Sequence, residues 1–153
     1  MDGRVALDLA VAARVRVDVS GWRDGIRAAC HPLVDAGAFE QRYEDRCVAI
    51  VEEQGPYIVL APGIALAHAR PEDGVRRLGL GVAVLQNPVA FGHAVNDPVD
   101  LVLAFGSPDR GSHVGLLSAL AGALLAGLAG RLREAPSDAA ARELLEGVIG
   151  DDV

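Results

Sequence analysis

Four histidines are the side chains of this chain best suited to group transfer near neutral pH, and His68 lies in the most informative setting. It follows two short apolar runs, Tyr57–Ala61 and Ile64–Ala67, which a Pro-Gly turn joins, and the loop after it carries Arg70 and ends at Gly74. A neutral imidazole, whose ordinary pKa is about 6.5, presents a nucleophilic nitrogen at pH 7. His68 is therefore a candidate nucleophile or proton carrier that needs no cofactor, although on spacing alone a structural histidine is the alternative.

His113 is the second candidate, because it directly follows Ser112, the predicted N-cap of a long helix. The free N–H groups and the positive dipole end of a first helical turn favour a bound phosphate. An imidazole there could also donate a hydrogen bond to a phosphoryl oxygen in the transition state. The alternative is an ordinary exposed histidine at a helix start.

His93 and His31 are weaker candidates. His93 precedes Asn96-Asp97-Pro98, a sequence that builds turns through side-chain bonds to the backbone and the fixed φ of proline. We expect this block to be structural and to shape the rim of the site, with His93 as the rival nucleophile. His31, beside Cys30 and far from the other motifs, is expected to be a structural or surface residue.

Several short blocks resemble the IIA component of the bacterial sugar phosphotransferase system, in its fructose–mannitol superfamily. The resemblance covers roughly residues 20–130, is most specific between 55 and 113, and includes Ser112-His113. The sequence motifs resemble the ascorbate-type branch most closely in these segments: Gly55-Pro56-Tyr57, Ala61-Pro62-Gly63, His68-Ala69-Arg70-Pro71-Glu72, Phe91-Gly92-His93 and Asn96-Asp97-Pro98-Val99.

The resemblance implies a phosphotransferase component in which His68 accepts a phosphoryl group, as a tele-phosphohistidine, from the carrier protein HPr. His68 would then pass the group to a IIB component. A membrane IIC component would move the substrate, with ascorbate or a related carbohydrate suggested by the motifs. His113 matches a second active-site histidine of the family and would stabilise the phosphoryl group, with support from Ser112 and from Arg70, which could neutralise phosphate charge.

Two positions depart from the family pattern. Ala67 stands where the family usually has proline, and mannitol-type relatives carry an arginine where this chain has Ile50-Val51-Glu52-Glu53. Either Arg70 or no residue would replace that arginine, and Arg70 could instead pair with Glu72 or Asp73. Two other functions therefore stay open: a regulatory IIA-like sensor of phosphorylation that serves no transport, and an interaction domain that keeps the fold without catalysis.

Composition and charge narrow the class further. The 153 residues, 51% of them hydrophobic, suit one domain, 1–153, with a core at about 14–132. No apolar run reaches the roughly 18 residues of a membrane span, and no signal peptide is recognisable, so we expect a cytoplasmic protein without direct membrane insertion. A net charge of −7 argues against a nucleic-acid partner. Cys30 and Cys47 are expected to be buried thiols, and the sequence predicts neither a metal nor a cofactor, because it lacks metal-ligand spacings and nucleotide fingerprints.

Hydrophobic periodicity predicts an α/β fold with a mixed, largely parallel central sheet flanked by helices. Residues 1–13 show no clear period and are expected to form a lead-in or a first helix. Strands are predicted at 14–19, 57–61, 64–67, 77–85, 89–91 and 100–106, with the last in the centre because it is apolar almost throughout. Helices are predicted at 21–36, 39–54, 112–132 and 136–149.

Overall fold

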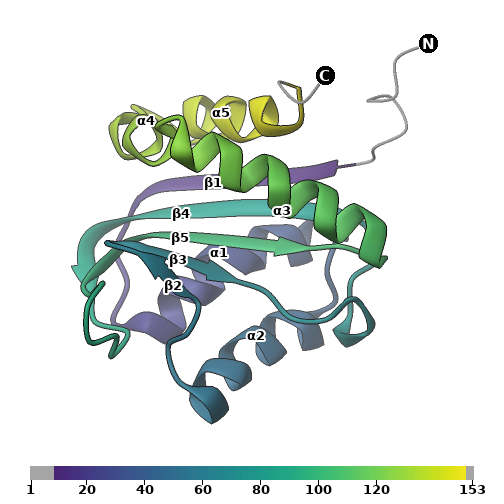
Figure 1. The fold of residues 1–153 in the computed structure, drawn as a ribbon, viewed down its shortest axis with the longest axis horizontal. Helices are drawn as coiled ribbons and strands as arrows, with labels where there is room; N and C mark the ends of the chain where they lie inside the picture. Colours follow the sequence, from purple (N-terminus) through teal and green to yellow (C-terminus); the bar gives the residue numbers. More distant parts are fainter. Residues whose placement is uncertain (1–8, 151–153) are drawn as a thin grey trace.

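The computed structural model describes residues 9–150, and within them one five-stranded mixed sheet lies between two layers of helices (Figure 1). The strand order is β1-β4-β5-β3-β2, so β5 is central as predicted. The pairs β1–β4 and β3–β5 are parallel, and β4–β5 and β2–β3 are antiparallel. The strands are β1 (Leu9–Val17), β2 (Val59–Ala61), β3 (Ile64–Ala67), β4 (Leu78–Val89) and β5 (Val99–Gly106).

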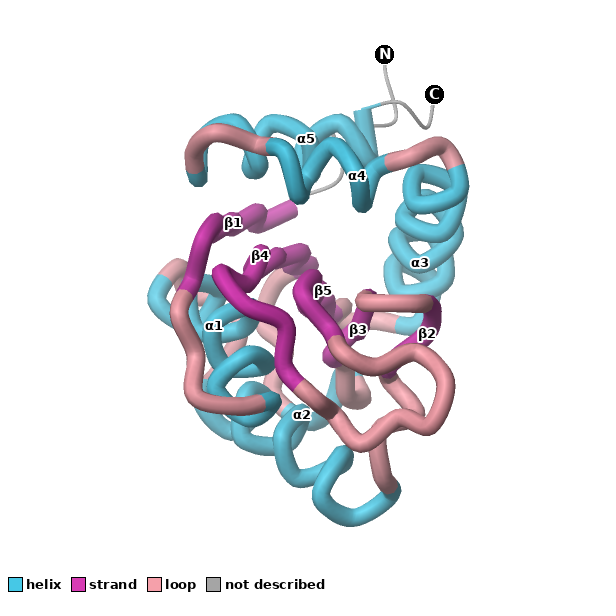
Figure 2. The backbone as a smooth tube through the Cα atoms, turned by 90° about the vertical axis from the view of Figure 1, so that its left-hand side faces the viewer, coloured by secondary structure: helices cyan, strands magenta, loops and turns pink. Residues whose placement is uncertain are grey.

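Two helices cover one face of the sheet and three cover the other, which confirms the predicted α/β class (Figure 2). The first layer consists of α1 (Trp22–Asp35) and α2 (Gln41–Gln54). The second consists of α3 (Arg110–Leu125), α4 (Leu128–Glu134) and α5 (Asp138–Gly150), and a short 3-10 turn, η2 (Pro71–Asp73), lies between β3 and β4.

Alternation along the central strand divides the core between these layers. Leu101, Leu103 and Phe105 of β5 pack toward α3–α5, whereas Val102 and Ala104 pack toward α1 and α2. Successive strand residues point to opposite faces, so a strand that is apolar throughout must be covered on both sides. The alternation therefore places the Phe105 side chain, near the end of β5, on the face of the sheet that α3 covers.

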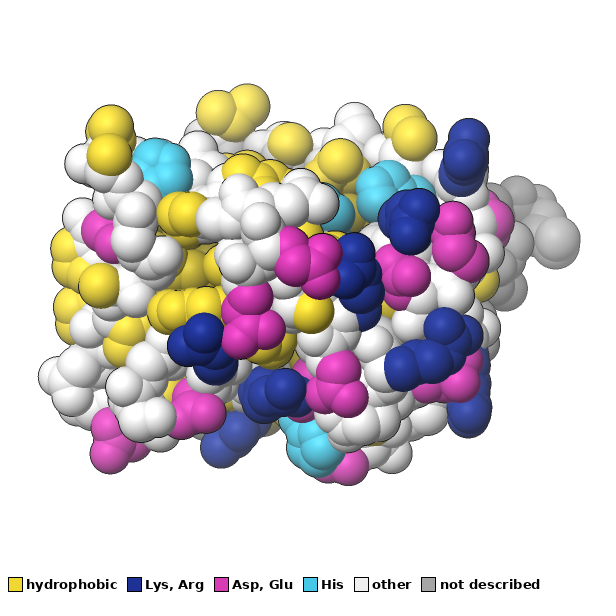
Figure 3. Space-filling view, turned by 90° about the horizontal axis from the view of Figure 1, so that it is seen from below, with side chains coloured by type: hydrophobic (Ala, Val, Ile, Leu, Met, Phe, Trp, Pro, Cys, Tyr) yellow, Lys and Arg dark blue, Asp and Glu magenta, His cyan; other side chains and the backbone are white. Residues whose placement is uncertain are grey.

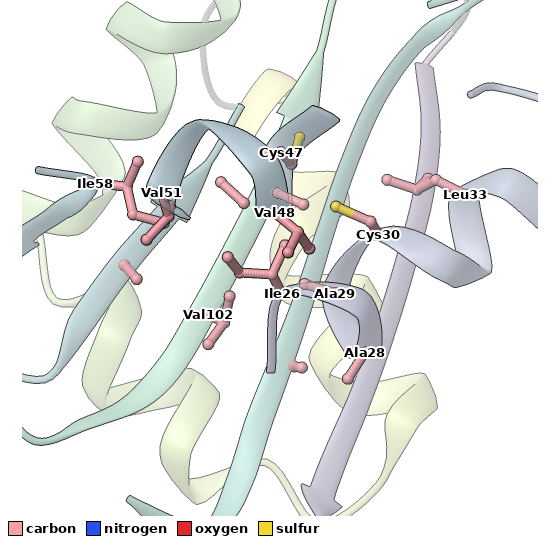
Figure 4. Packing of buried hydrophobic residues seen from close by; sticks show 14 of the residues in the cluster. Ile26, Ala28, Ala29, Cys30, Leu33, Cys47, Val48, Val51, Ile58 and Val102 are labelled. Atoms are coloured by element: carbon pink, nitrogen blue, oxygen red, sulfur yellow. The ribbon is translucent and has the colours of Figure 1, made fainter. Parts of the chain in front are cut away.

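The α1–α2 layer is tightly packed inside and charged outside. Cys30 and Cys47 are buried free thiols between the two helices, as predicted (Figure 4). A Cβ atom at Gly81 of β4 would lie 2.5 Å from the carbonyl oxygen of Ala29, so only glycine lets α1 approach this closely. On the outside, arginine and acidic side chains are interspersed (Figure 3), with ion pairs such as Arg23–Glu52.

The first strand differs from the prediction. Residues 9–13, expected in a lead-in or helix, pair in parallel with β4, and residues 1–8 lie outside the described residues. The segment shows no alternation because α1 packs on one side of β1 and α5 on the other. Buried residues such as Ala10 and Leu145 consequently extend beyond the predicted core of 14–132 on both sides.

The segment between β4 and β5 also differs. A turn at Asn87-Pro88 and an edge strand at 89–91 were expected, but β4 continues to Val89 and neither Ala90 nor Phe91 is in a strand. The pairing of β4 with β5 is irregular between Val84 and Val89. Such an irregularity accommodates Pro88, which cannot donate a ladder hydrogen bond.

The predicted long helix 112–132 is broken in two. It ends at Leu125, Gly127 adopts φ of 99°, and α4 begins at Leu128. Glycine takes this left-handed conformation without steric cost, which makes it a natural helix stop. Within residues 9–150 no single helix is long and apolar enough to span a membrane, and α3 and α4 reach that length only together, across a 74° bend.

Candidate phosphoryl-transfer site

The register of two parallel strands brings His68 beside an aromatic ring. The pairing of β3 with β5 ends at Ala67↔Ala104, and the residues that directly follow these two are His68 and Phe105. Their rings are stacked, with centroids 5.3 Å apart and planes 25° apart. Period-two alternation puts His68 on the same side of the sheet as Leu66, toward α3.

The same aromatic ring also contacts His113. The centroids of Phe105 and His113 are 4.8 Å apart, so Phe105 touches both imidazoles. Both histidines are half-buried and line one open pocket of about 690 Å³. The residues around the pocket are Arg46, Ile50, Gln54, Tyr57, His68, Ala69, Arg70, Pro71, Arg110, His113 and Val114.

The hydrogen bond of His68 determines which of its nitrogens is available. Its Nδ1 lies 3.0 Å from the carbonyl oxygen of Leu66, an atom that can only accept, so Nδ1 carries the proton. In the neutral ring Nε2 then keeps its lone pair. Burial lowers the pKa of His68 below its ordinary value, the hydrogen bond to Leu66 opposes that shift, and the charge of His113 adds to it. The ring is thus neutral at pH 7, with a nucleophilic Nε2.

Three arginines line the pocket, and two of them have acidic partners. Arg46 of α2 pairs with Glu53 at 2.9 Å, and exposed Arg70 lies 3.7 Å from Asp73. Arg110, in the first turn of α3, is exposed and has no carboxylate partner among residues 9–150. Its guanidinium is therefore the one of the three that is free to meet an incoming anion.

Two of these arginines were not singled out from the sequence. The helix before His68 was expected to offer no arginine at 50–53, but Arg46 lies one turn before Ile50 and both line the pocket. Residues four apart share a helix face, and this spacing could have found Arg46. Arg110 precedes His113 by three residues, so the same argument applies to α3.

The start of α3 differs from the prediction for Ser112. Asp109 is the N-cap, and its carboxylate accepts hydrogen bonds from the backbone N–H of Ser112 at 2.7 Å and from the Ser112 hydroxyl at 3.1 Å. Asp109 precedes the helix by one residue and is a better cap than a serine already inside it. The carboxylate therefore occupies part of the helix end that was expected to attract phosphate.

Comparison with known proteins shows the family to which this chain belongs. A sequence model described as phosphoenolpyruvate-dependent sugar phosphotransferase system, EIIA 2, matches residues 11–147. The chain belongs to this family. It is 38% identical over 100 residues to the ascorbate-specific PTS system EIIA component of Shigella boydii serotype 4 (strain Sb227). That match spans 65% of this chain and 65% of the relative's own length, and it confirms the resemblance to the ascorbate-type branch.

Solved structures of EIIA proteins share the fold. The mannitol-specific cryptic phosphotransferase enzyme IIA of Escherichia coli has a TM-score of 0.76 and 27% identity, covering 92% of both chains. A second match is to the complex of enzyme IIA for mannitol with phosphorylated enzyme IIB, also from Escherichia coli. There the TM-score is 0.72 and the identity 22%, over 96% of this chain and 97% of the other, which shows the common fold.

His93 lies at the opposite end of the sheet from the pocket that His68 and His113 line. The backbone oxygen of Asn96 accepts from the N–H of Gly63, just before β3, whereas His68 follows β3. The turn is held by Asp97, whose carboxylate accepts from the N–H groups of residues 91–93, and it does not line the pocket. The expectation that this block shapes the rim of the site is therefore wrong. The sequence alone does not show that Asn96-Asp97-Pro98 lies at the end of the strands opposite to His68.

The remaining candidates are also away from the pocket. His31 of α1 lies 2.9 Å from buried Glu44 and 3.5 Å from Asp35, so it is a structural residue between helices, as expected. Within the described part of the chain, no group of three His, Cys, Asp or Glu side chains is placed to hold a metal ion.

Proposed function

We propose that this chain is a phosphocarrier of the sugar phosphotransferase system, which accepts a phosphoryl group on Nε2 of His68 and passes it to a IIB component. One observation carries the proposal. His68 commits Nδ1 to a backbone carbonyl and lines a pocket that it shares with a second imidazole and three arginines. A nucleophile, a hydrogen-bond donor and positive charge at one pocket are what phosphoryl transfer requires.

The transfer needs no group beyond the two proteins. The Nε2 lone pair of His68 attacks the phosphorus of phospho-HPr, a new P–N bond forms, and the P–N bond of the donor histidine breaks. The proton on Nδ1 stays with the hydrogen bond to Leu66, which supports the positive charge that the ring acquires. A IIB side chain, a cysteine thiolate in this proposal, then attacks the same phosphorus, and Nε2 of His68 leaves with its lone pair.

The neighbouring groups stabilise charge rather than form bonds. His113 donates a hydrogen bond to a phosphoryl oxygen, and Arg110, which lacks a carboxylate partner in the described residues, neutralises part of the phosphate charge. Arg70 can join it, since its 3.7 Å contact with Asp73 is long and its side chain is exposed. The carboxylate of Asp109 at the helix start opposes tight retention of the phosphate.

Partner proteins would dock on the apolar side chains around the pocket. Tyr57 and Val114, which line the pocket, are large hydrophobic residues that remain exposed. HPr is the proposed donor and a IIB protein the proposed acceptor, supported by the mannitol IIA neighbour, which forms a complex with phosphorylated IIB. A membrane IIC component would use the phosphoryl group indirectly, with ascorbate as the substrate because a curated relative is ascorbate-specific.

The test is phosphoryl transfer with purified components. HPr labelled by enzyme I and phosphoenolpyruvate should give this chain a base-stable, acid-labile label, and His68→Ala should take none. His31→Ala, which removes a histidine outside the pocket, is the matched control and should label like the unaltered chain. Full labelling of His68→Ala would overturn the proposal. Discharge of the label onto a IIB protein, and not only its acceptance, separates transport from a purely regulatory role.

A further inference from the structure

A buried tyrosine hydroxyl joins the two segments that carry the site. The Tyr43 hydroxyl accepts a hydrogen bond from the backbone N–H of Ala69 at 2.9 Å and donates one to the carbonyl oxygen of Phe105 at 2.7 Å. Ala69 directly follows His68, and the ring of Phe105 touches both His68 and His113. Tyr43 itself lies in α2, is fully buried, and is absent from the lining of the pocket.

This hydroxyl lies where the sheet stops holding the two segments together. The pairing of β3 with β5 ends at Ala67↔Ala104, and β5 continues against β4 alone as far as Gly106. One residue past the last pair, the chain after His68 turns away into the loop that leads to η2 (Pro71–Asp73). A side-chain hydroxyl there takes the place of a ladder bond, since it can accept from one segment and donate to the other.

We propose that Tyr43 is a positioning residue for phosphoryl transfer: its hydroxyl ties the backbone after His68 to Phe105 and so sets the placement of the His68 and His113 rings relative to each other. The proposal rests on the phosphocarrier role of His68. Tyr43 does not touch the phosphoryl group, and it acts only through Ala69 and Phe105.

The surroundings of Tyr43 make it a rigid support. Its ring packs against Phe39 with centroids 4.6 Å apart, and a Cβ atom at Gly74 would lie 3.3 Å from the Cβ of Tyr43. Burial raises the pKa of Tyr43 well above its ordinary value, so the hydroxyl keeps the proton that it donates to Phe105. A fixed ring with a permanent donor can hold two backbone groups in one geometry.

The test variant is Tyr43→Phe, which keeps the ring and removes the hydroxyl. In a quenched-flow time course of transfer from phospho-HPr, the rate constant at saturating donor should fall roughly ten- to a hundredfold. Small misplacements of reacting groups reduce rates by factors of this size. The KM for phospho-HPr should stay the same, since the hydroxyl is buried away from the docking surface. The NMR titration of the His68 imidazole should also shift, because a displaced ring is buried to a different extent and burial lowers its pKa.

The control is a variant of equal stability loss at the other end of the central strand. Val99 is fully buried at the start of β5, whereas Phe105 lies near its end. A Val99 variant, Val99→Ala or Val99→Gly, chosen to match the fall in melting temperature of Tyr43→Phe, should leave both the saturating rate and the His68 titration unchanged. A Tyr43→Phe protein that transfers at the unaltered rate with an unaltered His68 titration would overturn the proposal. So would a matched Val99 variant that loses as much rate.

If Tyr43→Phe does not fold, the hydroxyl is altered instead of removed. The chain has two tyrosines, so in a Tyr57→Phe background biosynthetic 3-fluorotyrosine modifies Tyr43 alone. The fluorinated protein should differ from the same background without fluorine in rate and in His68 titration, and identity in both would overturn the proposal. Failure of the phosphocarrier role is recognised separately, because the unaltered chain would then take no label from phospho-HPr.

Discussion

His68 and His93 lie at opposite ends of the same strands and use their Nδ1 atoms in opposite ways. Nδ1 of His68 donates to the carbonyl of Leu66, whereas Nδ1 of His93 accepts from the N–H groups of Val95 and Asn96 at 3.2 and 3.0 Å. The neutral His93 ring therefore keeps its proton on Nε2, and both of its nitrogens are unsuited to attack. The comparison teaches that the backbone partner of one ring nitrogen decides whether the other can act as a nucleophile.

The two ends also differ in how fully their polar groups are paired. At the His93 end, the carboxylate of Asp97 accepts from three backbone N–H groups, and Trp22 packs on Phe91 with ring centroids 6.1 Å apart. At the His68 end, the Nε2 atom of His68 has no hydrogen-bond partner among residues 9–150, and the guanidinium of Arg110 pairs with no carboxylate of those residues. One end is closed by hydrogen bonds and serves the fold, and the other keeps its polar groups available.

The largest effect after loss of His68 is expected from His113. In His113→Ala, the rate constant for transfer from phospho-HPr should fall on the order of a hundredfold, as for removal of one donor to a developing charge. The label that forms should still be on His68, which peptide mapping under alkaline conditions can show. A His113→Ala protein that transfers at the unaltered rate would reduce the site to His68 alone and weaken the contrast with His93.

A smaller and more direct effect is expected in the pH titration of the rings. Burial and the charge of His113 lower the pKa of His68, so its NMR titration should lie below the ordinary value of about 6.5, with the proton on Nδ1 in the neutral form. The unfolded chain binds the second ring proton, which adds to Nε2, more readily than the folded chain does. The contribution of neutral His68 to the free energy of unfolding should therefore be lost as pH falls below about 6.5. Nitrogen-15 shifts of the imidazoles measure both, and they should show His93 as the opposite tautomer. The same tautomer in both rings would contradict the comparison.

The smallest effect on transfer is expected from His93→Ala. Its rate of labelling should remain within about twofold of the unaltered chain, while the free energy of unfolding falls by about 1 kcal/mol because two backbone N–H groups lose their acceptor. Chemical denaturation measures the second quantity. Loss of labelling in a folded His93→Ala protein would mean that the two ends are coupled.

The sequence was sufficient for the fold class and for the place of His68 and His113 on one pocket. The second of these came from the family resemblance, because no local pattern relates residues so far apart in the chain. Helices α1 and α2 were predicted within two residues at each end, since their apolar positions repeat at helical spacing.

The contacts that depend on strand register were not predicted. Phe105 lies in an apolar run that would be buried in any arrangement, and only the pairing Ala67↔Ala104 shows that its ring meets His68. In the sequence, Tyr43 occupies a position of the apolar stripe of its helix, and nothing distinguishes it there from the other buried residues of that stripe. The true cap, Asp109, was passed over for Ser112 because both residues are good caps and the helix start differs by only two residues.

The contact between Trp22 and Phe91 has a practical consequence for anyone following this protein by fluorescence. The chain has one tryptophan, and the structure places it at the end remote from the pocket. Indole emission will therefore report melting of the turn around Asp97 and the start of α1. A chemical change on the imidazole at the other end of the strands would leave the indole emission unchanged. An optical assay of the pocket therefore needs a dye attached beside it.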